Sequence, residues 1–180
     1  MIKTLRNDRQ KGLSMIEMVM YVALLGVLAV FMTNYVLQVI RVYQQARAER
    51  EILANMRVVV ETLEQAIGGA EESYAPTSRF NVTLGQLSLI TPIDPPASHT
   101  TGYTDVWVDN GRLWMRKEGQ TALPITAKTV QVKKFFLEQV AQAIGKQAVI
   151  ATIQIDANQF FGHQQASVTL QITVATRNNY

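Results

Sequence analysis

The sequence predicts an α+β protein in which a long N-terminal helix leads into a head of antiparallel strands. Three observations support this fold class. Residues 13–32 are apolar apart from one charge, no proline interrupts the chain from 13 to 75, and the C-terminal half alternates polar and apolar residues around a tight-turn signal. We therefore expect one helix over 13–68 that packs on an antiparallel sheet, with a β-rich globular head over 69–180, in a lollipop arrangement.

The apolar segment 13–32 reads LSMIEMVMYVALLGVLAVFM and carries a single charge, Glu17. About 20 apolar residues at 1.5 Å each match the roughly 30 Å hydrocarbon core of a bilayer. Basic residues dominate the preceding segment 1–12, which places the N-terminus in the cytoplasm and the head outside. The sequence thus predicts a single-pass protein of the cytoplasmic (inner) membrane with 13–32 as its transmembrane part.

The positive charge of the chain is confined to that N-terminal segment. The chain has 180 residues, 17 Lys and Arg, 14 Asp and Glu, and a formal net charge of +3. Without the four basic and one acidic residue of 1–12, thirteen of each sign remain, so the body is neutral. A neutral body disfavours nucleic acid as a partner. The absence of cysteine excludes disulfides, thiolate metal sites and cysteine catalysis.

Glu17 needs a partner, because a carboxylate deep in an apolar helix costs about 2.5–3.5 kcal/mol on insertion scales. A cleaved secretory signal does not fit, since the apolar stretch exceeds the roughly 7–15 residues of such signals. An uncleaved anchor carrying an extracytoplasmic binding or sensor domain remains the alternative, although it gives Glu17 no role. A Glu17 side chain that faces water near the membrane surface is the simplest structural interpretation.

Residues 11–17, KGLSMIE, followed by the apolar helix, resemble the class III signal of type IV pilins and type II secretion pseudopilins. In that family a prepilin peptidase cuts after the glycine, the new N-terminal residue is methylated, and a glutamate is fifth in the mature chain. The resemblance implies a leader over 1–12 that ends in Lys11 and Gly12, cleavage between Gly12 and Leu13, and methylation of Leu13. It implies assembly roles for Glu17 and for Gly26.

A paired Glu17 follows from this processing. Cleavage frees the amino group of Leu13, a cation in the same apolar layer as the carboxylate. Within a filament, Glu17 of one subunit and the Leu13 amine of a neighbour neutralise two charges that hydrocarbon disfavours, and wrong registers leave both unpaired.

Leu13 stands where phenylalanine is frequent in the family, a substitution that some members share. Asn34 stands where many major pilins have a helix-kinking proline, and this departure, together with the absence of a disulfide pair, favours a minor subunit. More weakly, the strand 112–116, Leu123-Pro124 and the strand 130–137 follow the order found in J-type minor pseudopilins. The implied partners are the prepilin peptidase and methyltransferase, other pilins or pseudopilins in a hetero-oligomeric filament, and membrane lipid before assembly. No cofactor is implied, and secretion, pilus and DNA-uptake systems all remain open.

Beyond the membrane segment, the helix turns polar over 44–51 and then becomes amphipathic. The apolar positions at three- and four-residue steps are Leu53, Met56, Val60, Leu63 and Ile67. Gly68-Gly69 predicts the end of the helix.

Asn110-Gly111 predicts a type I′ hairpin between strands 105–109 and 112–116. This turn pairs Trp107 with Trp114 and the charged residues with each other on one face, and the aliphatic residues on the face toward the core. Further strands are expected at 79–84, 86–91, 129–140, 149–156 and 167–176, with a bulge at Lys133-Lys134.

The head shows no motif of catalysis, so we expect a protein that is not an enzyme. His99 and His163 are isolated in expected loops, and neither a zinc site nor other bound metal is predicted. Asp94, Asp105 and Asp156 could supply oxygens to calcium, but none lies in an acidic run. Trp107 and Trp114 form the candidate interaction patch, with core packing as the favoured alternative.

Overall fold

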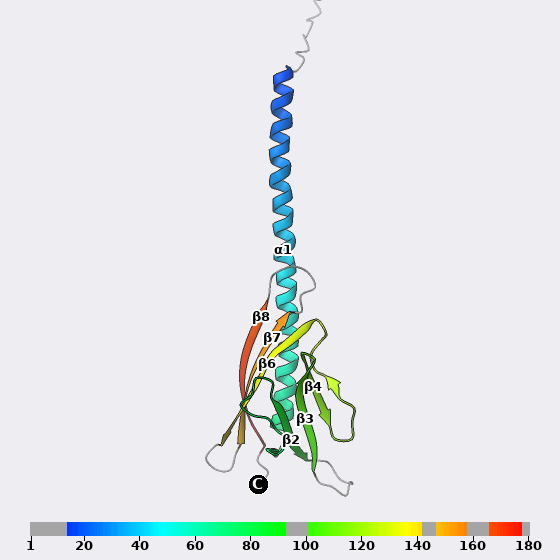
Figure 1. Cartoon of the computed structure of the whole chain (residues 1–180), viewed down its shortest axis with the longest axis vertical. Coiled ribbons are helices and arrows are strands. Elements are labelled where there is room, and N and C mark those ends of the chain that lie inside the picture. The colour runs from blue at the N-terminus through cyan, green and yellow to red at the C-terminus, as the bar shows by residue number, and fades with distance from the viewer. Residues whose placement is uncertain (1–13, 93–100, 142–146, 158–165, 178–180) are drawn as a thin grey trace, which may run out of the picture. The chain divides into compact units, whose positions relative to one another are not determined.

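The computed structural model describes residues 14–92, 101–141, 147–157 and 166–177. One long helix, α1 (Met15–Gly68), precedes eight strands. These are β1 (Glu72–Ser73), β2 (Gln86–Pro92), β3 (Thr101–Asp109), β4 (Arg112–Lys117), β5 (Leu123–Pro124), β6 (Val130–Ala141), β7 (Gln147–Ala157) and β8 (Ser167–Ala175) (Figure 1). The predicted α+β class with a long N-terminal helix is confirmed.

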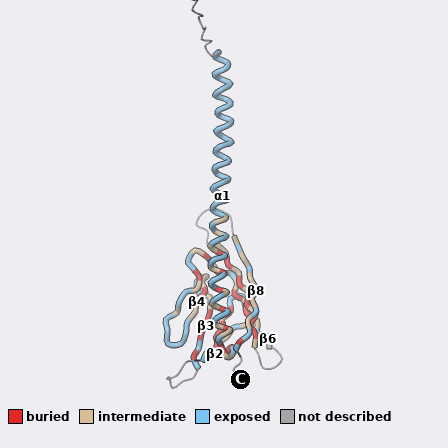
Figure 2. The backbone as a smooth tube through the Cα atoms, turned by 180° about the vertical axis from the view of Figure 1, so that it is seen from behind, coloured by how far each residue is buried: buried red, intermediate tan, exposed pale blue. Residues whose placement is uncertain are grey.

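The chain divides into two compact units whose boundary lies inside α1, one covering residues 1–43 and the other 44–180. In the first unit every described residue is solvent-exposed (Figure 2). In the second unit, α1 buries side chains from Ile52 to Ile67 in a core that it shares with the strands.

The strands of the second unit form two antiparallel sheets rather than one. Five strands follow the order β1-β2-β3-β4-β5, and three follow β6-β7-β8. A single core collects buried side chains from α1, from β2, β3 and β4 of the first sheet, and from β6 and β7 of the second. The helix therefore closes the apolar faces of both sheets.

The core-facing stripe of α1 differs in part from the predicted one. The prediction placed Leu53 and Val60 on it, but Leu53 is 57% exposed and Val60 is only half-buried. The buried residues follow steps of four and three along the helix, as a period of 3.6 requires: they are Ile52, Met56, Val59, Leu63 and Ile67.

The hairpin of β3 and β4 has the predicted register, with Trp107 opposite Trp114 and Asp105 opposite Arg116. Asn110 and Gly111 have φ values of 50° and 71°, as a type I′ turn requires. The aliphatic face lies in the core, where Val106 and Leu113 are fully buried.

Strand β6 also behaves as predicted, with a register shift between Val132 and Lys134 in its pairing with β7. The expected strand over 79–84 is wrong. Only isolated bridges occur there, one of which joins Leu84 to Phe135 of the other sheet. Asn81 has a φ of 60°, which breaks the extended backbone, and its N–H donates to the carbonyl of Leu137 at 2.8 Å.

Candidate functional site

The most distinctive surface of the described chain is the apolar first part of α1. Its best 18-residue window has a mean hydropathy of 2.3, and none of that window is buried within the chain. Side chains as large as Phe31 and Met32 are 68% and 73% exposed. By length and composition, α1 is a candidate membrane-spanning helix near the N-terminus, which fits a single-pass membrane protein.

Glu17 lies in the first turn of α1, the only charged residue between Met15 and Ile40. The helix starts with backbone bonds to the carbonyl of Ser14, which accepts from the N–H groups of Glu17 and Met18 at 3.0 and 3.1 Å. A carboxylate at this end of a helix is favoured by the partial positive charge of the exposed N–H groups. The side chain of Glu17 is exposed and therefore available to a group from outside the chain.

Gly26 lies nine residues after Glu17, on the same exposed part of α1. A Cβ atom added there would meet nothing within 4 Å in the chain. Packing within this chain therefore gives no reason for a glycine at this position, in contrast to Gly85, where an added Cβ would lie 2.8 Å from the carbonyl oxygen of Arg79. Lys11, Gly12 and Leu13 lie outside the described residues.

A second polar side chain of the apolar part of α1, that of Thr33, is hydrogen-bonded within the helix. Thr33 donates its hydroxyl to the carbonyl of Ala29 at 2.8 Å, one turn earlier. This back-bonding removes an unsatisfied donor from the apolar layer. Glu17 thus differs from Thr33 in carrying a full charge that helix geometry alone does not neutralise.

Trp107 and Trp114 lie on the outer face of the hairpin, so core packing is wrong for both rings. Each is half-buried, and each ring lies beneath an arginine: the guanidinium of Arg112 is 5.2 Å from the centroid of Trp114, and that of Arg116 is 5.8 Å from Trp107. The Trp114 indole N–H donates to the carbonyl of Asp109 at 3.2 Å. Cation–π contacts of this kind stabilise the exposed face by about 0.5–1 kcal/mol each.

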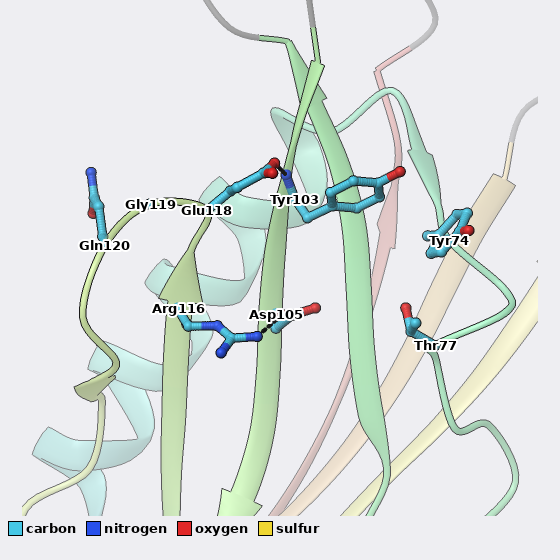
Figure 3. A pocket seen from close by; sticks show the side chains of 8 residues that line it. All are labelled: Tyr74, Thr77, Tyr103, Asp105, Arg116, Glu118, Gly119 and Gln120. Atoms are coloured by element: carbon cyan, nitrogen blue, oxygen red, sulfur yellow. Dashed lines mark hydrogen bonds and ion pairs between the residues drawn. The ribbon is translucent and has the colours of Figure 1, made fainter. Parts of the chain in front are cut away.

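A shallow depression of about 560 Å³ opens on the same outer face, next to β3 and β4 (Figure 3). The rings of Tyr74 and Tyr103 meet at a centroid distance of 5.3 Å on one side of it. On the other, Arg116 Nη2 lies 2.9 Å from Asp105 Oδ2, and Glu118 accepts the Tyr103 N–H at 3.0 Å. The charged side chains are bonded within the chain, which gives this depression a structural explanation.

The calcium candidates have other partners or lie outside the described residues. Asp105 accepts from Ser88 Oγ at 2.7 Å and pairs with Arg116. Asp156 accepts from the Gln154 amide at 3.3 Å. Asp94, His99 and His163 fall outside the described residues. Among those described, no three His, Cys, Asp or Glu side chains gather into a possible metal site.

Comparisons with protein-family models, characterised proteins and solved structures found no match to this chain.

Proposed function

We propose that this chain is a structural subunit, of the minor class, of a type IV pilus-like filament or type II secretion pseudopilus. A prepilin peptidase cleaves it between Gly12 and Leu13 and Leu13 is then methylated. The mature subunit leaves the cytoplasmic membrane by packing its helix among those of other pilins or pseudopilins.

The observation that carries this proposal is a wholly exposed apolar helix that begins beside a lone carboxylate. None of the described residues covers the apolar part of α1, which therefore requires lipid or the helices of other subunits. Glu17 is the last residue of the signal KGLSMIE, which lies at the N-terminal end of this surface. A neighbouring subunit's Leu13 amine supplies the opposite charge that makes Glu17 tolerable in an apolar layer.

Processing is tested on the full chain extracted from membranes of cells with and without a prepilin peptidase. Intact mass and N-terminal sequencing should find a chain that starts at methylated Leu13 only where the peptidase is present. A chain that starts at Met1 in both strains would refute the filament proposal and favour an uncleaved membrane-anchored binding or sensor domain.

Assembly is tested with Glu17→Ala in the strain that contains the peptidase and partner pilins. The variant should still be cleaved, since the cleavage site is intact, but its share in sheared filaments should fall at least tenfold. Gln38→Ala is the matched control, because Gln38 is also an exposed polar residue of the apolar part. Normal incorporation of Glu17→Ala would overturn the pairing of Glu17 with Leu13.

A further inference from the structure

The two edges of the sheet β6-β7-β8 are protected very differently. Edge strand β6 carries Lys133 and Lys134, has the register shift next to Val132, and contacts other backbone, since the Phe135 N–H donates to the carbonyl of Thr83 at 2.8 Å. Charge, bulges and covering segments are the devices by which proteins prevent edge strands from pairing with other chains. The edge at β6 uses all three.

Among the described residues, edge strand β8 has none of these protections. It reads SVTLQITVA, without charge or proline, and pairs with β7 over nine residues without a register shift. In the described part of the chain, β8 has a strand on one side only. Its core-facing residues are half-buried although they pack against the core, so a further strand would cover more of them: they are Val168, Leu170, Ile172 and Val174.

The bonds that flank β8 determine which backbone groups point away from β7. The Ala157 N–H donates to the carbonyl of Ala166 at 3.0 Å, and the Thr176 N–H donates to the carbonyl of Gln147 at 2.9 Å. Because alternate residues of a strand direct N–H and C=O to the same side, the even-numbered residues of β8 bond to β7. The odd-numbered residues present theirs to the free edge: Ser167, Thr169, Gln171, Thr173 and Ala175.

The sequence of β8 is nearly the same read from either end. Gln171 is its centre, flanked symmetrically by leucine and isoleucine, then by two threonines, then by two valines. An antiparallel copy centred on Gln171 therefore places like residues opposite each other: Leu170 and Ile172, Thr169 and Thr173, Val168 and Val174. We propose that the free edge of β8 binds β8 of a second copy of this chain in this register, which joins two three-stranded sheets into one of six strands.

This register matches both the backbone groups at the free edges of the two copies and the side chains on the two faces of the joined sheet. It places odd-numbered residues opposite odd-numbered ones, so the free N–H and C=O groups of one copy meet those of the other. It also places the half-buried aliphatic row of one copy beside that of the other, whereas a slip of one residue would set aliphatic beside polar side chains. The contact is isologous, as a closed two-fold dimer requires.

The pairing also fixes the relative direction of the two copies. Figure 1 shows β8 running alongside the second half of α1, and antiparallel pairing reverses this direction in the partner. In the contact, the second halves of α1 of the two copies therefore run in opposite directions. The pairing goes beyond the proposed function, since it requires neither cleavage at Gly12 nor assembly.

The register is tested by single cysteines in the full chain in detergent, because the natural sequence has no cysteine. Facing residues of a hydrogen-bonded antiparallel pair have Cα atoms about 5.5 Å apart, within disulfide range. Gln171→Cys should form a disulfide dimer by itself. Thr169→Cys and Thr173→Cys should form one only when mixed, since each alone leaves its cysteines four residues, or about 13 Å, apart. Equal cross-linking of all three single variants would overturn the proposed register.

The free association is tested by light scattering of the full chain in detergent. Gln171→Lys and Gln171→Glu should each weaken the dimer at least tenfold by placing like charges opposite each other, and a mixture of the two should restore it. Gln171→Ser is the matched control at the same position, because it shortens the side chain without adding a charge, and it should retain the dimer. A monomeric natural chain, or a mixture that stays monomeric, would overturn the proposal.

Discussion

The two halves of α1 share one continuous backbone but have surfaces of opposite kinds. In the first half, residues such as Leu25 are 64% exposed, and no side chain up to Tyr43 is buried. In the second half, Ile52 and Leu63 are fully buried by the strands. Helix geometry is therefore not what separates the halves. The difference lies in the apolar surface, which the strands cover in the second half and which no described residue covers in the first half.

The exposed polar residues of the second half form side-chain contacts with each other along the helix surface. Arg57 Nε lies 2.7 Å from Glu61 Oε1, and the Gln45 amide donates to Glu49 at 3.0 Å, both one turn apart. The hydrogen bond that Arg57 donates to Glu61, and then the negative charge of Glu61, raise the pKa of Arg57 above its ordinary value. Such ladders stabilise exposed helix faces in water, and in the described chain they begin only after the first unit ends.

The largest expected difference between the halves is in the stability of the second unit. Leu63→Ala should lower its free energy of unfolding by about 2–5 kcal/mol, because a fully buried leucine leaves a cavity. Leu25→Ala should leave it unchanged. Denaturant unfolding of the full chain in detergent, followed by tryptophan fluorescence, measures this, since Trp107 and Trp114 both lie in the second unit. Equal losses of unfolding free energy in the two variants would contradict the difference in burial between the two halves of α1.

Membrane retention should show the opposite sensitivity. Leu24→Lys places a charge in the apolar part, and a charge at the centre of a membrane helix costs about 2.5–3.5 kcal/mol of insertion free energy. The fraction of the Leu24→Lys protein that resists alkaline extraction from membranes should fall several-fold. Leu53→Lys, at a residue 57% exposed in the second half, should be retained as well as the natural chain. Full retention of Leu24→Lys would contradict a membrane-spanning role for the first half.

Much of the fold follows from local sequence. Asn110-Gly111 determines the turn, and the turn in turn determines the whole register of β3 and β4. The bulge next to Lys134 was predictable because two adjacent lysines interrupt the alternation of a strand. The end of α1 at Gly68 follows from the glycine pair.

The features that the sequence did not predict depend on contacts between distant residues. The segment 79–84 alternates like a strand, but the bond of Asn81 to Leu137 and the bridge of Leu84 to Phe135 hold it between two sheets. Trp107 faces outward because the aliphatic face of its hairpin meets the core. Strand alternation pairs it with Trp114 without saying which face is buried.

The candidate sites divide in the same way. Glu17 was found from its charge within an apolar segment and from the signal motif, and Gly26 from the family resemblance alone. The structure adds that both positions are exposed on α1. The free edge of β8 was missed, although the symmetry of its sequence around Gln171 is visible without a structure. Only the sheet order shows that this strand lies at an edge.

A smaller difference in the free energy of unfolding is expected between two kinds of polar contact, those that join α1 to the rest of the second unit and those within the helix. Asn55 Oδ1 accepts the Ala127 N–H at 2.8 Å, and its amide donates to the carbonyl of Glu51 at 2.9 Å, so it ties α1 to the segment between β5 and β6. Asn55→Ala should lower the free energy of unfolding by about 0.5–1.5 kcal/mol, the usual net contribution of one hydrogen bond. Gln45→Ala, which removes only a bond between exposed helix side chains, should lower it by less. The same unfolding experiment measures both. If the two variants were equally stable, Asn55 would contribute no more than an exposed residue, and burial of the apolar stripe alone would hold α1 to the strands.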